Sequence, residues 1–154
     1  MVNTFWKILA TSGGVGLAPV APGTAGAIIA SAVAFLLQSY TDYDTFQIIN
    51  IALVVFFTVL GVIATDKLES EWGKDPGKIV IDESVGQWIT YIMVPFGITN
   101  ILIGLALFRL FDIWKPLGIR NLEKLKGGYG VMGDDILAGI YANIVLQLLV
   151  KFVL

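Results

Sequence analysis

The sequence predicts an all-α protein, a small polytopic membrane bundle of about four to five membrane helices, some short or re-entrant. The first observation behind this prediction is composition: the 154 residues are 56% hydrophobic and only 14% charged, whereas soluble domains are about 25% charged. The second is that several long stretches carry no ionisable side chain. The third is that Gly- and Pro-containing turns separate these stretches, as expected for helices that reverse direction.

The first half of the chain predicts one short and one full-length membrane helix. Residues 25–40 are apolar and follow a Gly- and Pro-rich stretch, whereas 46–65 form an uncharged run of the roughly 20 residues needed to cross a bilayer core. Residues 66–78 are polar and mixed in sign. We expect this segment to be a loop whose acids form a solvated face: Asp66, Glu69, Glu71 and Asp75.

The second half predicts a further hairpin and a last helix. Pro95 and Gly97 divide an uncharged stretch into helices over roughly 82–94 and 98–114, the first of which is short for a complete crossing. A basic, Gly-rich loop is expected at 115–133, after which Asp134 and Asp135 open an apolar helix to about Val153. We expect residues 1–154 to form a single domain without a cleaved signal peptide.

The basic residues predict an orientation. If the helices form two hairpins, the N-terminal segment and the loops 66–81 and 115–133 lie on one side of the membrane. The opposite turns, TDYD and VPFG, contain no Lys or Arg, so the positive-inside rule makes the first side cytoplasmic. That side collects eight basic residues: Lys7, Lys67, Lys74, Lys78, Lys115, Arg120, Lys124 and Lys126.

The residue types that are missing narrow the chemistry. The chain has no Cys and no His, which excludes a Ser-His-Asp triad, a thiol nucleophile and histidine metal ligands. Oxygen ligands remain, and these suit Mg²⁺ or Mn²⁺. The net charge of -2, without a basic stripe, indicates no nucleic-acid partner.

Three charged residues interrupt the apolar run LALFRLFDIWKP. Arg109, Asp112 and Lys115 lie three residues apart, which on a helix gives roughly one face. Charges in an apolar membrane segment mark a functional site by default. The alternative is an interfacial belt, in which the basic chains extend to the membrane surface and Asp112 merely pairs with Arg109.

Two pairs of adjacent acids provide candidate metal ligands. Asp82 and Glu83 begin one predicted helix, and Asp134 and Asp135 begin another. Helix capping explains one acid of each pair. The remaining carboxylates would repel one another on the same membrane face, and a divalent cation removes that conflict.

The segment GLAPVAPGTAG, residues 16–26, supplies flexible backbone followed by a hydroxyl. Gly23 and Thr24 could present N–H groups and an oxygen to a phosphate at a helix start. A plain membrane-entry turn explains the same residues equally well.

The chain resembles the phosphatidylglycerophosphatase A family in four motifs that span about Gly13 to Gly139: GLAPVAPGTAG, KDPGKIVIDESVGQW, FRLFDIWKP and GVMGDD followed by ILAG. The resemblance implies a Mg²⁺-dependent lipid phosphatase of the bacterial inner membrane. Such an enzyme removes the terminal phosphate of phosphatidylglycerophosphate and leaves phosphatidylglycerol, a step of phospholipid biosynthesis.

These observations give a working hypothesis of metal-assisted phosphomonoester hydrolysis. Asp112 is expected to be a further ligand or a general base, and direct attack by water and an aspartyl-phosphate intermediate both stay open. The phosphate is expected to bind to Gly23, Thr24, Arg109 and Lys115. The leading metal ligands are Asp82, Glu83, Asp134 and Asp135.

A small transporter or ion-binding membrane protein is the alternative, because the same charges could line an ion path. Against it, the uncharged span 46–65 places no ionisable group near the midplane. We expect a phospholipid substrate and membrane association, and homo-oligomerisation stays open.

Overall fold

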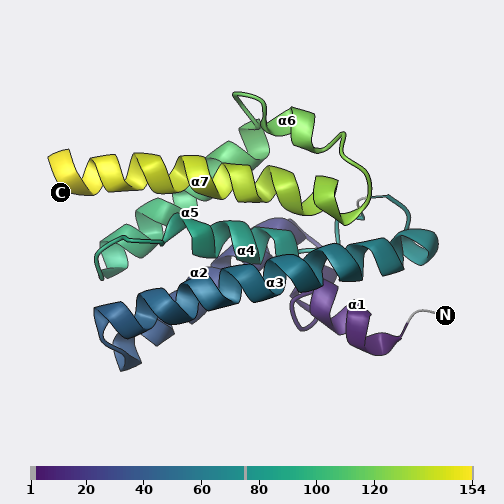
Figure 1. Ribbon diagram of the computed structural model, residues 1–154, viewed down its shortest axis with the longest axis horizontal. Helices are drawn as coiled ribbons and strands as arrows, with labels where there is room; N and C mark the ends of the chain where they lie inside the picture. Colours follow the sequence, from purple (N-terminus) through teal and green to yellow (C-terminus); the bar gives the residue numbers. More distant parts are fainter. Residues whose placement is uncertain (1–2, 75, 154) are drawn as a thin grey trace.

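The computed structural model describes residues 3–74 and 76–153, and no strand occurs among them (Figure 1). This architecture confirms the all-α prediction. The helical segments are α1 (Thr4–Ala10), the short 3-10 turn η1 (Val15–Leu17), α2 (Pro22–Tyr40), α3 (Tyr43–Trp72), α4 (Ile81–Thr90), α5 (Ile98–Trp114), α6 (Ile119–Leu122) and α7 (Gly128–Phe152).

Three of these helices, α2, α3 and α7, are long and apolar enough to cross a membrane. Helix α5 is also apolar but has 17 residues. Helix α4 has only 10 residues, and at 1.5 Å per residue it reaches about 15 Å, half of a bilayer core. A short helix within a membrane bundle is therefore confirmed, although α4 ends four residues before the expected boundary at Val94.

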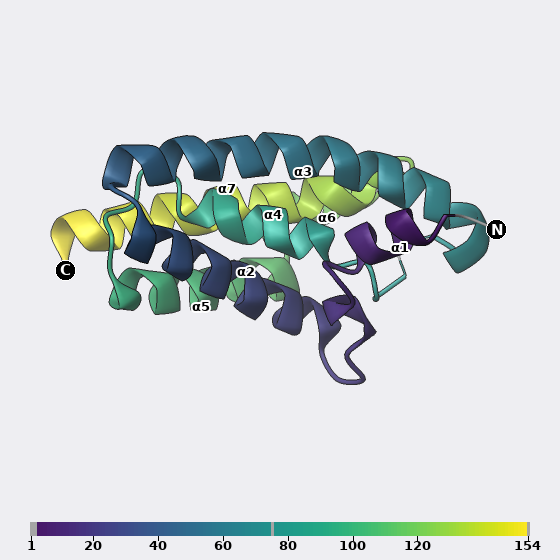
Figure 2. The ribbon, with the colours of Figure 1, turned by 90° about the horizontal axis from the view of Figure 1, so that it is seen from below.

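Helix α4 forms the centre of the bundle. All of its residues except Glu83 are buried, and it packs against α2, α3, α5 and α7. Viewed from below, it lies between α2 and α3 (Figure 2). A short polar-ended helix surrounded by longer ones is viable in lipid because its neighbours, rather than lipid, contact its backbone.

Two glycines let α4 and α7 approach closely. A Cβ on Gly86 would lie 2.6 Å from the carbonyl oxygen of Asp135, and one on Gly139 would meet the backbone of Gly86. Side chains larger than hydrogen would separate the helices, so small residues at a crossing bring two membrane helices together. This contact fixes the first turns of α4 beside the acidic part of α7.

The C-terminal end of α4 is capped by amide side chains from neighbouring helices. Asn50 of α3 donates its Nδ2 hydrogen to the carbonyl of Trp88 at 2.9 Å. Asn143 of α7 donates to the carbonyls of Thr90 at 3.0 Å and Ile92 at 2.7 Å. These bonds satisfy carbonyl groups that a helix end would otherwise leave unpaired away from water.

The expected loop at 66–78 is mostly helix, which corrects that prediction. Helix α3 continues to Trp72 because its last turns pack against α1, with Leu68 fully buried and Lys7 of α1 paired with Glu71. Asp66 and Glu69 are exposed, as expected for a solvated face. Asp75 lies outside the described residues.

The expected start of the last helix at Asp134 was also wrong, because α7 begins six residues earlier at Gly128. Its first glycine contacts the backbone of Val62, where a Cβ would clash. The backbone N–H of Gly128 donates to Oδ1 of Asp66 at 2.7 Å. Packing against α3 and this capping bond stabilise a helical start that the glycine content disfavours.

Candidate active site

Four segments that are distant in sequence meet at one end of the bundle. They are the first turn of α2, the first turn of α4, the last turn of α5 and the second turn of α7. A Cβ on Gly23 of α2 would touch Glu83 of α4 and lie 3.4 Å from Nη1 of Arg109 on α5. Lys115, which follows α5, bonds to Asp134 of α7 at 2.6 Å. The motifs chosen from the sequence thus converge.

Three acids form the centre of this end of the molecule. Asp82, Glu83 and Asp135 each offer a carboxylate oxygen, and these oxygens all lie within 4.8 Å of one another. We call these three residues the acid triad. Asp82 and Asp135 are 7% and 3% exposed, so water cannot screen their repulsion as it would at a surface.

The triad contains polar atoms that the described residues do not satisfy. Oδ1 of Asp82 and Oε2 of Glu83 are buried without a hydrogen-bond partner. Burial raises the pKa of Asp82 well above its ordinary value of 3.8, and the charges of Glu83 and Asp135 raise it further. Burial also raises the pKa of Glu83 above 4.5. Both shifts show that the ionised triad is unfavourable on its own.

Two basic residues lie beside the acids, each with an acidic partner. Arg109 pairs through Nη1 with Asp112, one helical turn along α5. Lys115 does not continue the face of α5, because it adopts a left-handed conformation at the helix end (φ 50°). Its Nζ nevertheless reaches Asp134 and also Glu123, the latter at 2.5 Å.

The pKa of Lys115 reflects these two carboxylates. Burial alone would lower it, but the hydrogen bonds and charges of Asp134 and Glu123 outweigh burial and raise the pKa above its ordinary value of 10.5. Lys115 therefore carries a full positive charge at neutral pH. Oδ1 of Asp134 remains buried without a partner.

The first turn of α2 completes the site with backbone donors. Pro22 occupies the start of the helix, and no side chain caps it. Gly23 and Thr24 follow, and their N–H groups belong to the first turn, which lacks intrahelical acceptors. Free N–H groups and the positive end of a helix dipole favour an anion. Because Gly23 lies next to Arg109, the backbone N–H groups of this turn and the guanidinium of Arg109 are close enough to bind the same anion.

These residues fit a hard divalent cation. The donor set consists of carboxylate oxygens alone, which suits Mg²⁺ or Mn²⁺. The unpartnered oxygens of Asp82, Glu83 and Asp134 are available as ligands. Of the four acids expected as ligands, three form the triad, whereas Asp134 lies beside it and bonds to Lys115.

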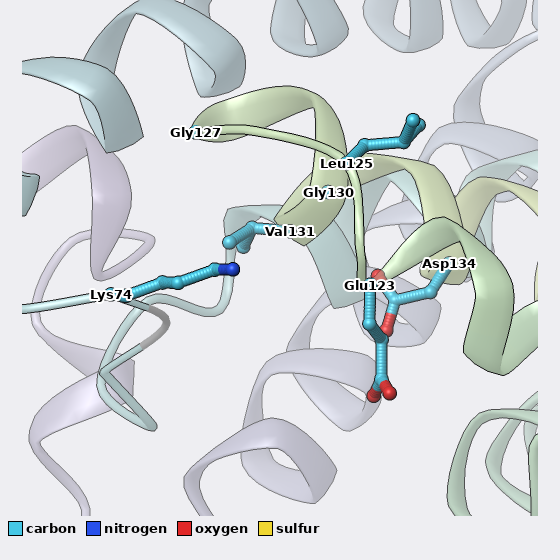
Figure 3. Close-up of a pocket in the computed structure, with 7 residues that line it drawn as sticks. All are labelled: Lys74, Glu123, Leu125, Gly127, Gly130, Val131 and Asp134. Atoms are coloured by element: carbon cyan, nitrogen blue, oxygen red, sulfur yellow. The ribbon is translucent and has the colours of Figure 1, made fainter.

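A cavity of about 270 Å³ opens beside Asp134, and sequence reasoning did not identify two of its charged residues (Figure 3). Glu123 and Asp134 line one side, and Lys74 faces the space from the other. Glu123 is a single acid in a basic loop, and no local pattern predicts its ion pair with Lys115, eight residues earlier. No sequence signal distinguished Lys74 from other surface lysines.

Comparisons with known proteins agree with this geometry. The model of the family described as phosphatidylglycerophosphatase A matches residues 8–150. No solved structure matches the chain.

Three relatives show how far the similarity extends. A Bacteroides thetaiotaomicron protein, named provisionally as a phosphatidylinositol-3-phosphatase, is 46% identical over 90% of this chain and 89% of its own length. Proteins named phosphatidylglycerophosphatase A from Haemophilus influenzae and Escherichia coli are 39% and 34% identical. They align with 90% and 88% of this chain, and with 85% and 77% of their own lengths. The chain belongs to the phosphatidylglycerophosphatase A family of phosphatases.

Proposed function

We propose that the protein hydrolyses phosphatidylglycerophosphate to phosphatidylglycerol and inorganic phosphate, with Mg²⁺, as a step of phospholipid biosynthesis. The observation that carries the proposal is the buried acid triad beside Arg109 and the first turn of α2. A cation site next to anion donors is the arrangement that phosphoryl transfer requires. We take the chain as one catalytic domain.

The metal would be held by Asp82, Glu83 and Asp135, with the free Oδ1 of Asp134 as a fourth ligand. When bound, Mg²⁺ supplies charge neutralisation at the phosphoryl oxygens and favours ionised ligands. The unpartnered oxygens support these assignments. Binding would also relieve the repulsion that burial imposes on the triad.

The phosphate would be bound by groups on the other side of the triad. Arg109 offers its guanidinium and Gly23 and Thr24 offer backbone N–H groups to non-bridging oxygens. Lys115 contributes a second positive charge close to Asp134. These donors stabilise the charge that develops as the bond between phosphorus and the glycerol oxygen breaks.

Asp112 is the proposed general base. Its Oδ2 pairs with Arg109, which orients the carboxylate. The carboxylate would take a proton from the attacking water and then return that proton to the leaving glycerol oxygen. Its direct contact with the proposed phosphate-binding residue Arg109 supports this role.

We further propose that the site faces the cytoplasm at a bacterial inner membrane. Supporting this, two lysines near the same end lie over tryptophan rings: Lys67 is 5.4 Å from the ring centroid of Trp6, and Lys78 is 3.9 Å from that of Trp72. Aromatic and basic residues together are typical of a membrane interface, and basic residues favour the cytoplasmic side.

A second substrate is favoured by one observation. The Bacteroides thetaiotaomicron relative, at 46% identity, is named for phosphatidylinositol 3-phosphate. Both lipids carry a phosphomonoester on a glycerophospholipid headgroup, so one site could hydrolyse either.

The test is phosphate release in detergent micelles from each of the two lipids, with Mg²⁺ and with excess EDTA. Mg²⁺-dependent release from phosphatidylglycerophosphate, at the higher kcat/KM of the two, is the expected result. Faster release from phosphatidylinositol 3-phosphate would reassign the substrate. No release from either lipid by folded protein would reject the phosphatase proposal and favour the ion-binding or transport alternative.

A further inference from the structure

An apolar groove of about 320 Å³ lies on a different face of α4 from the acid triad. Its floor consists of Ile81, Ser84 and Trp88, which recur at the spacing of one helix face. Its walls come from α1, α2 and α3, and include Ile8, Ile29, Val33 and Phe57. The same short helix therefore carries two residues of the triad, Asp82 and Glu83, on one side and lines an apolar groove with another.

The groove is open to the lipid side of the bundle. Ile29 and Ile8 on its rim are 46% and 55% exposed. Helices α2 and α3 both pack on α4 but have few contacts with each other, and α4 is visible between them (Figure 2). Because α2 and α3 are long enough to cross the membrane, hydrocarbon rather than water is available to fill the space between them.

One end of the groove is polar and lies at the first turn of α4, which also carries two of the three triad residues. Ser12 lines it there, and its Oγ lies 3.1 Å from Oγ of Ser84. Ile81 and Ser84 flank the two triad residues Asp82 and Glu83 in the sequence. The floor then extends to Trp88, about 10 Å along the helix axis. A molecule with its polar end at the triad would thus find apolar contacts deeper in the membrane.

We propose that this groove holds one acyl chain of the phospholipid whose phosphate reaches the acid triad, an inference that rests on the proposed phosphatase function. The occupant is an acyl chain because the lining is apolar, the opening faces the bilayer and the polar end lies at the helix turn that carries Asp82 and Glu83. The groove would make recognition depend on the lipid tail as well as on the phosphate. Water-soluble phosphomonoesters with the same headgroup would then be poor substrates.

The activity test compares Val33→Phe, which narrows the groove, with Val55→Phe. Val55 is 60% exposed on α3 and does not line the groove. We expect Val33→Phe to raise KM for the diacyl lipid about tenfold with kcat unchanged, since small volume changes in an apolar pocket have effects of this size. Hydrolysis of the fully deacylated substrate should be slow in the unmodified protein and equal in Val33→Phe. Val55→Phe should resemble the unmodified protein.

A second measurement tests occupancy without catalysis. In a protein whose other tryptophans are changed to Phe, Trp88 fluorescence should be quenched by phospholipid brominated along one acyl chain, and Val33→Phe should reduce the quenching at least about twofold. Val55→Phe should leave it unchanged. This readout does not need turnover, so it applies to any folded variant, including one without activity.

The outcomes separate the two proposals. Equal KM for Val33→Phe and Val55→Phe, or equal kcat/KM for acylated and deacylated substrates, would overturn the groove assignment while leaving the phosphatase intact. Absence of Trp88 quenching would also overturn it. Quenching that depends on Val33, without phosphate release from any lipid, would support chain binding and reject the proposed reaction.

Discussion

The two ends of α4 differ in how their buried polar groups are paired. At its C-terminal end, neutral amides of Asn50 and Asn143 satisfy the carbonyls of Trp88 and Thr90. At its N-terminal end, Asp82 and Glu83 crowd against a third acid and leave oxygens without partners. At the first end these backbone carbonyls are paired, although Oδ1 of Asn50 is itself buried without a partner. At the second end the unpaired atoms are carboxylate oxygens, which can ligate a cation.

This difference in hydrogen-bond pairing indicates which end of a buried helix carries the functional site of a membrane bundle. Buried polar groups are costly unless paired, so the paired end indicates selection for stability. The unpaired carboxylates at the other end favour a ligand, and a cation is the ligand that we propose. Substitutions at the N-terminal end of α4 should therefore reduce activity, whereas substitutions at its C-terminal end should reduce stability.

The largest effect is expected from removing one carboxylate of the triad. Asp82→Asn and Asp135→Asn should each lower kcat at least about a hundredfold, because each removes a proposed metal ligand next to the transferred phosphate. In EDTA, both variants should unfold at a temperature equal to or above that of the unmodified protein, since one repelling charge is gone. Phosphate release and thermal unfolding in detergent measure the two effects.

Glu69→Gln is the matched control for these variants. Glu69 is an exposed acid of α3 outside the site, so its neutralisation should leave kcat within about twofold. Full activity of folded Asp82→Asn would remove Asp82 from the metal ligands.

At the opposite end of α4, Asn143→Leu should reduce stability instead. The change leaves the carbonyl of Thr90 without its donor and removes the stronger of two bonds to Ile92. Leaving a buried group unsatisfied costs about 1–3 kcal/mol. The midpoint of thermal unfolding should fall by about 2–4 °C for each kcal/mol, while kcat measured well below that midpoint stays unchanged.

Asn121→Leu provides the comparison for this substitution, because Asn121 is an exposed asparagine of α6. Its unfolding temperature should change by less than about 2 °C. A kcat loss in Asn143→Leu equal to that of the triad variants would contradict the division of α4 into a structural and a functional end.

The sequence was sufficient to predict the five longer helices, α2, α3, α4, α5 and α7, because long uncharged runs have one stable solution in lipid. It did not predict the short helices α1 and α6. It was misleading where tertiary contacts decided the outcome. The glycines at 127, 128 and 130 predict a loop, yet α7 begins at Gly128. Only a glycine fits against the backbone of Val62 at this position, and the N–H of Gly128 donates to Asp66. Similarly, the polar end of α3 remains helical because α1 packs on it. Such contacts between distant segments are invisible to local patterns.

For the candidate site, charge patterns found the acids and the bases, and they offered the pairing of Asp112 with Arg109 as an alternative, but they did not predict the partners of Lys115. The face shared by Arg109 and Asp112 follows from helical spacing, and the structure pairs them. The position of Lys115 does not follow, because its left-handed backbone turns it away from the helix and toward Asp134. The separation of Asp134 from the triad likewise depends on where α7 begins, which the sequence placed too late.

Arg109→Lys should have an intermediate effect, and it tests whether the unpaired end binds phosphate as well as metal. Lysine keeps the positive charge but lacks the planar fork that can contact Asp112 and a phosphate oxygen together. We expect kcat/KM to fall about tenfold. Arg120→Lys, at an exposed arginine of α6, should have no effect. Equal kcat/KM for both variants would mean that Arg109 serves only as the partner of Asp112.

The smallest effect is expected in the pH dependence of stability without metal. The pKa of Asp82 in the folded protein lies above its ordinary value of 3.8, because of burial and then of the neighbouring acids. The folded protein therefore retains a proton that the unfolded chain releases. This contribution to stability is fully present below about pH 3.8 and is lost as the pH rises through the raised pKa. In excess EDTA, the unfolding temperature should therefore fall as the pH rises from about 4 into the neutral range.

Mg²⁺ should reverse this trend, because the cation binds the ionised carboxylates and so stabilises the folded protein more at pH 8 than at pH 5. Asp82→Asn should flatten the slope in EDTA, since an amide does not titrate, whereas Glu69→Gln should retain it. An unfolding temperature that rises with pH in EDTA would mean that the triad is already compensated by the chain itself. The contrast between the two ends of α4 would then reflect packing alone, and the argument for a bound cation would lose its electrostatic basis.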